Sequence, residues 1–161
     1  MGSPHALILP YPAQGHVIPC MELAHCLVDR GFKVTFVNTE FNHNRVVTAL
    51  SKNGDDMGQI HLVTIPDGLE PGEDRNDLGR LTESILNVMP GCLEELILNT
   101  SEKENDRITC LIADENMAWA LEVAQKMGLR RAAFWPACAG LLAVLLNIPK
   151  LIEDGILEEN G

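Results

Sequence analysis

The strongest constraint on the fold of this sequence is a regular alternation of short apolar runs with segments of helical periodicity. Five short runs rich in apolar and β-branched residues occupy residues 6–10, 33–38, 60–65, 108–113 and 131–135. The first run is apolar throughout, which is typical of a strand buried on both faces of a parallel sheet. Apolar residues at helical spacing follow each run, over residues 18–28, 41–50, 78–97, 117–127 and 137–151. The alternation predicts an α/β fold with a doubly wound parallel sheet, and Pro90-Gly91 predicts a kink or break in the third helix.

Size and charge restrict the kinds of protein this chain can be. Its 161 residues, 46% of them hydrophobic, suit a single domain. Twelve Lys and Arg residues stand against 23 Asp and Glu, and the net charge of −11 argues against nucleic-acid binding and anionic membrane surfaces. The five cysteines form an odd set without a Cys-x-x-Cys pair, which favours reduced, buried thiols. Because the N-terminal residues show no secretory signal, we expect a cytoplasmic protein.

One apolar stretch, residues 132–148, has no charged side chain and is nearly long enough to cross a bilayer. Pro136 divides it into a strand and a helix, and Asn147 and Pro149 interrupt its far end. A membrane helix needs one continuous hydrogen-bonded backbone, so we expect no stable membrane insertion. The helix over residues 137–151 is apolar almost all round, and it is therefore either central or in need of a covering surface.

The first apolar run leads through a Pro/Gly loop into a helix, and His16 lies at that turn. The positive end of a helix dipole disfavours an imidazolium there and leaves a neutral ring that can take a proton. Gly15 permits close approach of a ligand to the backbone, the loop offers N–H donors to an anion, and Pro19 suits a first helical turn. A histidine at a helix start is also often a cap or a packed ring, so this segment alone leaves its role open.

Asp114 ends the fourth apolar run and precedes a helix. In a doubly wound sheet the ligand crevice lies at the carboxyl ends of the strands, so Asp114, His16 and the corner Trp135-Pro136 should share one edge. A carboxylate bonded to one ring nitrogen of His16 would fix its tautomer while the other nitrogen accepts a proton. Capping the following helix is the alternative role of Asp114.

Three further features are open to other roles. Cys20 lies at metal-ligand spacing from His16, but two ligands are too few, and we expect no metal site. Glu40 lies near the place of a ribose-binding acid, yet the first turn lacks the Gly-x-Gly-x-x-Gly pattern of NAD-dependent oxidoreductases. The acidic segment 70–77 is either a solvated connection or a mobile wall over a binding cleft.

Four motifs, in their order along the chain, resemble those of the plant family 1 UDP-sugar-dependent glycosyltransferases. They are Pro12-Ala13-Gln14-Gly15-His16-Val17-Ile18-Pro19, Ile65-Pro66-Asp67-Gly68-Leu69, Ile112-Ala113-Asp114 and Phe134-Trp135. The resemblance covers essentially the whole chain. It implies the GT-B arrangement of two Rossmann-like domains, in which residues 1–161 would be a truncated, acceptor-binding N-terminal domain. The C-terminal domain that binds the UDP-sugar would be absent.

The resemblance also implies a reaction and roles for individual residues. His16 would remove a proton from the acceptor, and Asp114 would orient His16. An inverting transfer, with UDP-glucose as the expected co-substrate and no cofactor, would then glycosylate a hydroxyl or carboxyl of a small hydrophobic plant metabolite. The residues implied at the acceptor are Gly15, Asn116 and Leu145, and those implied at the donor sugar are Trp135 and Pro136. Pro136 departs from the family pattern, because many relatives have Thr or Ser after the Trp and a proline cannot make that hydroxyl contact.

Two functions follow from this resemblance. In the first, the chain is the acceptor-binding part of a glycosyltransferase and is nearly inactive alone, because the donor site is missing. In the second, it is a non-enzymatic truncated product that binds an apolar metabolite or associates with a separate donor domain.

Overall fold

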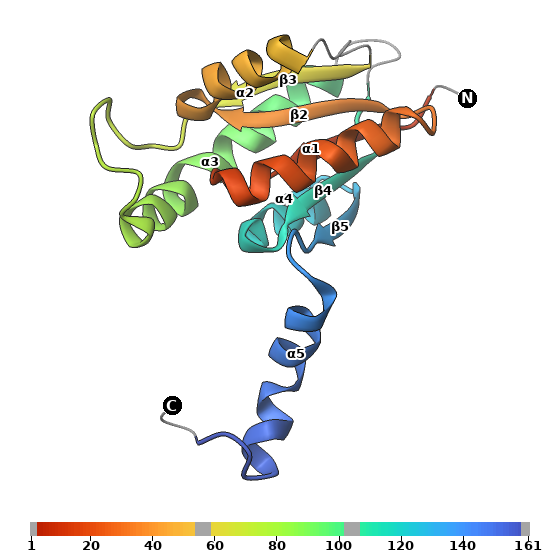
Figure 1. The fold of residues 1–161 in the computed structure, drawn as a ribbon. Helices are drawn as coiled ribbons and strands as arrows, with labels where there is room; N and C mark the ends of the chain where they lie inside the picture. The colour runs from red at the N-terminus through yellow and green to blue at the C-terminus, as the bar shows by residue number, and fades with distance from the viewer. Residues whose placement is uncertain (1–2, 54–58, 102–106, 159–161) are drawn as a thin grey trace.

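The five predicted strands form one parallel sheet (Figure 1). The computed structural model describes residues 3–53, 59–101 and 107–158. Its strands are β1 (His5–Leu9), β2 (Lys33–Thr39), β3 (Ile60–Ile65), β4 (Cys110–Asp114) and β5 (Arg130–Phe134). They lie in the order β3-β2-β1-β4-β5, and all four neighbouring pairs are parallel. The predicted doubly wound, Rossmann-like sheet is confirmed.

Helices cover both faces of this sheet (Figure 1). Four helices form these layers: α1 (Gln14–Val28), α2 (Glu40–Asn53), α3 (Leu78–Ser101) and α4 (Trp119–Lys126), the last preceded by the 3-10 turn η1 (Glu115–Met117). A fifth helix, α5 (Ala139–Glu153), follows β5. The helices α1 and α2 pack on one face, and α3 and α4 on the other. α3 is one continuous helix through Pro90, so the prediction of a break there is wrong.

The start of α1 differs from its prediction. The helix begins at Gln14, which places His16 in its first turn and Pro19 in its second. The expectation that Pro19 lies in the first turn is therefore wrong. At its actual position the missing N–H of Pro19 leaves the carbonyl of Gly15 without its usual helical partner.

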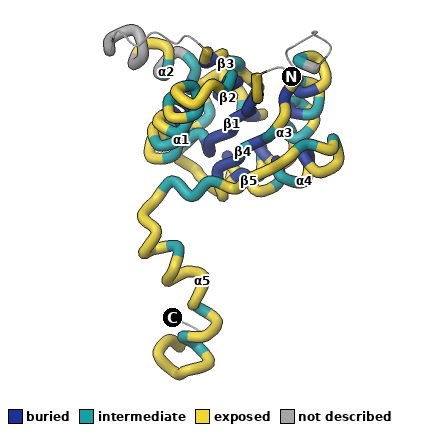
Figure 2. Tube along the Cα trace, turned by 90° about the vertical axis from the view of Figure 1, so that its right-hand side faces the viewer, coloured by how far each residue is buried: buried dark blue, intermediate teal, exposed yellow. Residues whose placement is uncertain are grey.

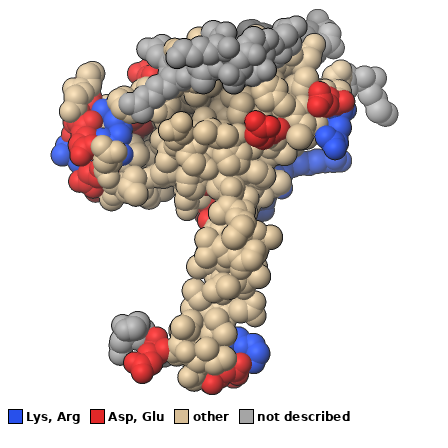
Figure 3. Space-filling model, in the orientation of Figure 1, with Lys and Arg blue, Asp and Glu red and all other residues tan. Residues whose placement is uncertain are grey.

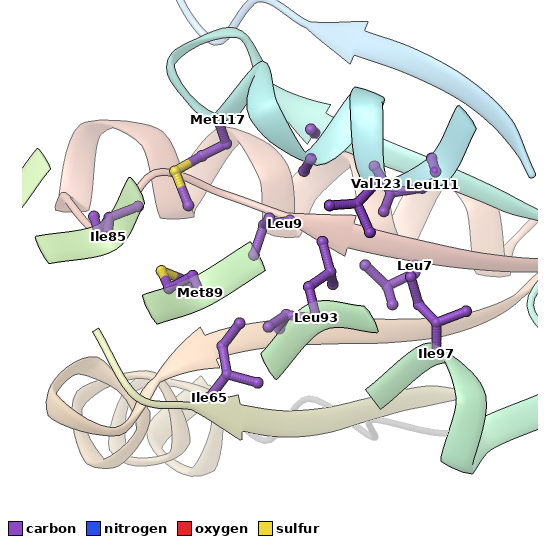
Figure 4. Close-up of a cluster of buried hydrophobic side chains, with 14 of the residues drawn as sticks. Leu7, Leu9, Ile65, Ile85, Met89, Leu93, Ile97, Leu111, Met117 and Val123 are labelled. Carbon is purple, nitrogen blue, oxygen red and sulfur yellow. The ribbon is translucent and has the colours of Figure 1, made fainter. Parts of the chain in front are cut away.

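Two apolar cores lie on the two faces of the sheet. Successive side chains of a strand point to opposite faces, so a strand covered on both sides is apolar at most of its positions. In β1, Leu7 and Leu9 pack with α3 and α4 in the larger core (Figure 4), whereas Ile8 between them packs with Phe36 and α1 in the smaller one. This arrangement fixes β1 at the centre of the domain.

The last helix, α5, lies outside the layers of the domain. It extends away from the sheet beyond β5 (Figures 1 and 2), and none of its residues is buried. The strand β5 is an edge strand whose first four residues are exposed. Of the two alternatives for this apolar helix, the central one is wrong, since no described residue covers it. Among the described residues, no helix has the length and hydropathy to cross a membrane.

The cysteines follow their prediction only in part. All five are free thiols, but only Cys20 is buried, while Cys26 and Cys138 are exposed. Cys26 lies on α1 away from the sheet, and Cys138 precedes the uncovered α5. The expectation of buried thiols is therefore wrong for these two residues.

Candidate functional site

The strand order reverses beside β1, and this reversal places two loops side by side. The chain leaves β1 toward β2 and β3 on one side, whereas β4 and β5 lie on the other. At such a switch point the connections that follow the two central strands diverge and leave a crevice at their carboxyl ends. His16, in the first turn of α1 after β1, and Asp114, the last residue of β4, lie on the two sides of this point.

A short hydrogen bond joins these two side chains. The Nδ1 atom of His16 is 2.8 Å from Oδ2 of Asp114. The Asp114 side chain has no exposed surface, whereas the His16 side chain is 27% exposed. Because a carboxylate can only accept, Nδ1 of His16 donates, and the neutral ring then has its free lone pair on Nε2. The pair therefore has the arrangement of a general base and its orienting carboxylate.

Asp114 performs both of the roles that the sequence left as alternatives. While Oδ2 bonds to His16, Oδ1 accepts from the backbone N–H of Asn116 at 3.0 Å and caps the turn η1. The two oxygens of one carboxylate can serve two donors at once. The cap thus holds the carboxylate in the orientation that the histidine needs.

Tyr11 is a contact of His16 that the sequence patterns did not indicate. Its ring lies edge-on to the imidazole, with ring centroids 5.3 Å apart, and its hydroxyl is 3.5 Å from Oγ1 of Thr82 on α3. Tyr11 is buried, so the imidazole has a packed aromatic neighbour in addition to its carboxylate partner. The available signal was the position of the chain's single tyrosine between the first strand and His16.

The remaining residues implied at the acceptor are only partly near the pair. A Cβ built on Gly15 meets no atom within 4 Å, so the backbone beside His16 is open to a ligand. Asn116 follows the cap of Asp114, and its residue surface is exposed. Leu145 is exposed on α5, which the structure does not bring to this edge (Figure 1).

The two residues implied at the donor lie at the same edge of the sheet. They follow Phe134, the last residue of β5, which is in register with Asp114 at the end of β4. Trp135 donates from Nε1 to the carbonyl of Cys138 at 3.0 Å, and this bond turns the chain toward α5. Trp135 and Pro136 are both partly exposed.

Cys20 does not extend the pair into a metal site. Burial, and to a smaller extent the negative charge of Asp114, raise the pKa of the Cys20 thiol to about 12. A thiol that stays protonated at neutral pH is a poor metal ligand. In the part of the chain that the structure describes, no group of three His, Cys, Asp or Glu residues could hold a metal ion.

Known proteins with similar sequences are plant glycosyltransferases. UDP-glycosyltransferase 83A1 of Arabidopsis thaliana is 47% identical over 167 residues, covering 100% of this chain and 36% of the relative. The (R)-mandelonitrile beta-glucosyltransferase of Prunus dulcis is 34% identical, covering 96% of this chain and 33% of the relative. No family model matches the chain.

Solved structures show the same fold. The O. sativa protein Os79, in complex with U2F and trichothecene, superposes with a TM-score of 0.72 at 22% identity, covering 94% of this chain and 37% of that one. Arabidopsis thaliana UGT89C1 with quercetin gives a TM-score of 0.69 at 20% identity, over 88% of this chain and 37% of that one. The chain thus spans about a third of the length of the relatives that it matches. With the fold, the motif order and these relatives in agreement, the chain belongs to the plant family 1 UDP-glycosyltransferases, whose GT-B fold it represents in part.

Proposed function

We propose that this chain supplies the acceptor-activating part of an inverting UDP-glycosyltransferase, with His16 as the general base. The observation that carries the proposal is the 2.8 Å bond between Nδ1 of His16 and the buried carboxylate of Asp114. This bond directs the free lone pair of the imidazole to Nε2 on a partly exposed ring. A base of this kind can reach a hydroxyl of a bound acceptor.

The proposed reaction moves one proton and exchanges one bond. Nε2 of His16 takes the proton of the acceptor hydroxyl as the oxygen attacks the anomeric carbon of the sugar. The bond from that carbon to the diphosphate breaks on the opposite face, UDP leaves with the electron pair, and the configuration inverts. Asp114 stabilises the imidazolium that forms. A positioned base contributes about 10² to 10⁴ in rate, so donor orientation and stabilisation of the leaving diphosphate must supply the rest.

The names of the relatives support the substrate classes in this proposal. Relatives are described as glucosyltransferases of mandelonitrile and of 7-deoxyloganetin, and solved structures hold quercetin or UDP. We therefore expect a UDP-sugar, with UDP-glucose first, and a small hydroxylated acceptor. Trp135 and Pro136 are proposed to face the sugar. Because the chain spans about a third of its relatives, we expect little turnover from it alone.

The test is a chimera in which this chain replaces the matched segment of UDP-glycosyltransferase 83A1. Transfer from UDP-glucose to quercetin would be followed by chromatography, for the parent chimera and for His16→Ala. We expect kcat/KM to fall by about 10²-fold or more in His16→Ala, because the base is lost. The matched control is His61→Ala, an exposed histidine on β3, which should leave kcat/KM unchanged. Near-normal turnover in His16→Ala would contradict the assignment.

The exposed apolar surface of α5 favours a second candidate function, association with a separate donor domain. Leu146 on this helix is 73% exposed, and Figure 3 shows charged side chains only at its far end. Burying such a surface against a partner would remove apolar area from water. Sedimentation of the chain with the separately produced remainder of UDP-glycosyltransferase 83A1 should then show a complex.

A matched pair of variants localises this association. Leu146→Glu on α5 should weaken the complex at least tenfold, because it introduces a charge into the apolar surface. Leu98→Glu makes the same change at an exposed leucine of α3 and should have no effect. Absence of a complex with the unmodified chain would remove this candidate.

A further inference from the structure

The guanidinium of Arg75 is fully bonded within the loop that joins β3 to α3. Nε and Nη2 donate to the two carboxylate oxygens of Asp67, each at 3.1 Å. Nη2 also donates to the carbonyl of Leu69, and Nη1 donates to the carbonyls of Glu70 and Glu73, at 2.9 to 3.1 Å. All five N–H donors of the side chain are thereby used. The Arg75 and Asp67 side chains are 13% and 6% exposed, so this bidentate pair is shielded from solvent.

These bonds change the interpretation of the acidic segment 70–77. Six of its eight residues are exposed, as the solvated connection predicts, yet the carbonyls of Leu69, Glu70 and Glu73 converge on one guanidinium that is largely shielded from solvent. Gly68, at φ 83°, packs against α3, where an added Cβ would lie 2.5 Å from Oγ of Ser84. Leu69 packs against the same core as Tyr11 and Ala13. The loop is therefore attached both to α3 and to the core beneath the His16 turn.

The same arginine is linked to the His16 turn through the start of α2. Its Cζ lies over the ring of Phe41, 4.8 Å from the centroid. The next residue, Asn42, is buried and donates from Nδ2 to the carbonyl of Pro12 at 2.8 Å. The following carbonyl, that of Ala13, accepts from the backbone N–H of His16 at 2.9 Å. A continuous set of contacts thus leads from Arg75 to the backbone that holds His16.

We propose that Arg75 is a positioning residue for the His16 turn, acting through Phe41 and Asn42. Its planar guanidinium holds the loop on one side and Phe41 on the other, and Asn42 transmits that placement to Pro12. A lysine at this position would keep the charge but could neither bond to both oxygens of Asp67 nor stack on Phe41 in the same way. The importance of the turn for acceptor activation rests on the proposed function, whereas the coupling itself does not.

Hydrogen exchange on the 161-residue chain tests the coupling. We expect Arg75→Lys to speed exchange of the Leu69 amide, which is bonded to Asp67, and of the His16 and Val17 amides by about tenfold. The matched control is Arg80→Lys, because Arg80 pairs with Glu73 of the same loop from an exposed position on α3. In Arg80→Lys the exchange rates of the same three amides should stay within threefold of those in the parent chain. Unchanged exchange rates of the β1 amides would show that the Arg75→Lys variant is folded.

A double-mutant cycle tests whether Arg75 acts through Asn42. If the two residues belong to one set of contacts, Arg75→Lys and Asn42→Ala together should speed His16 exchange no more than about threefold beyond the larger single effect. If the single effects multiply, Arg75 and Asn42 act independently and the proposal is wrong. If Asn42→Ala fails to fold, the same cycle can be run with Arg75→Lys and Phe41→Leu, because Phe41 is exposed.

A spectroscopic measurement separates positioning from a general loss of stability. The ¹⁵N resonances of the His16 ring report its tautomer and its bond to Asp114, and they should shift in Arg75→Lys but not in Arg80→Lys. Unshifted ring resonances together with unchanged amide exchange in Arg75→Lys would overturn the proposal. Because none of these measurements requires turnover, the coupling can hold even if His16→Ala in the chimera disproves the role of His16 as the base.

Discussion

Replacing Asp114 with asparagine separates the two functions of that carboxylate. The asparagine carbonyl can still accept from the backbone N–H of Asn116, which Oδ1 of Asp114 now does at 3.0 Å. Its NH₂ group then faces Nδ1 of His16, where Oδ2 now accepts at 2.8 Å. Two donors cannot share that bond, so the ring must turn or adopt the tautomer with its proton on Nε2. In that tautomer Nε2 can no longer accept the acceptor's proton.

The structure indicates a large effect of Asp114→Asn on rate and a small one on stability. Loss of the correct tautomer and of the carboxylate that stabilises the imidazolium should lower kcat/KM of the chimera by about 10² to 10⁴. The cap of η1 survives, so the free energy of unfolding should change little. Asp114→Ala removes the bond to His16 and the cap together, and it should be less stable than Asp114→Asn by about 1 kcal/mol.

Two assays check this prediction. Transfer of glucose to quercetin by the chimera gives the kinetic effect, and urea unfolding of the 161-residue chain compares the stability of the two variants. The ¹⁵N resonances of the His16 ring report the tautomer directly. If Asp114→Asn kept more than a third of the parental kcat/KM, the inference that Asp114 sets the tautomer of a catalytic base would be refuted.

Two other predictions concern the loop and the thiols. Gly68→Ala should lower the free energy of unfolding by about 2 to 4 kcal/mol, because φ is positive and the new Cβ meets Ser84 and Val88. The control is Gly72→Ala, at φ 95° with no neighbour within 4 Å, which should lose only the backbone strain of about 1 to 2 kcal/mol. If urea unfolding gave the same loss of unfolding free energy for both variants, the packing argument would be contradicted. In alkylation at pH 8 followed by mass spectrometry, exposed Cys26 should react and Cys20 should not, because a pKa of about 12 leaves roughly one Cys20 thiol in 10⁴ ionised. Equal labelling of the two in the folded chain would show that Cys20 is accessible.

Local sequence patterns identified the strands and the general place of the site. The strand over residues 60–65 has the predicted bounds, and the others differ by one or two residues. Apolar runs are most reliable for the central strands, because helices cover both faces of the sheet there. The rule that ligands bind at the carboxyl edge of such a sheet predicts that His16 and Asp114 share one edge.

Local patterns were less informative about helix ends and about α5. Pro19 suggested a helix start because proline is common there, yet α1 begins five residues earlier and continues through it. Proline preference is a weak constraint when the flanking apolar face is buried against a sheet. The uniform apolarity of α5 indicated that it needs a cover, but apolarity alone does not say what covers it.

The sequence by itself determined the alternation of strands and helices, the family, and the two residues of the candidate site. Only the tertiary structure decided that they bond, that Asp114 caps a turn with its other oxygen, and that Tyr11 packs on the ring. It also decided that Arg75 connects the loop after β3 to the turn after β1. The physical reason is the distance along the sequence over which each kind of information acts. Periodicity reports which face of a single segment is apolar, whereas the bond between His16 and Asp114, 98 positions apart, depends on strand order and register.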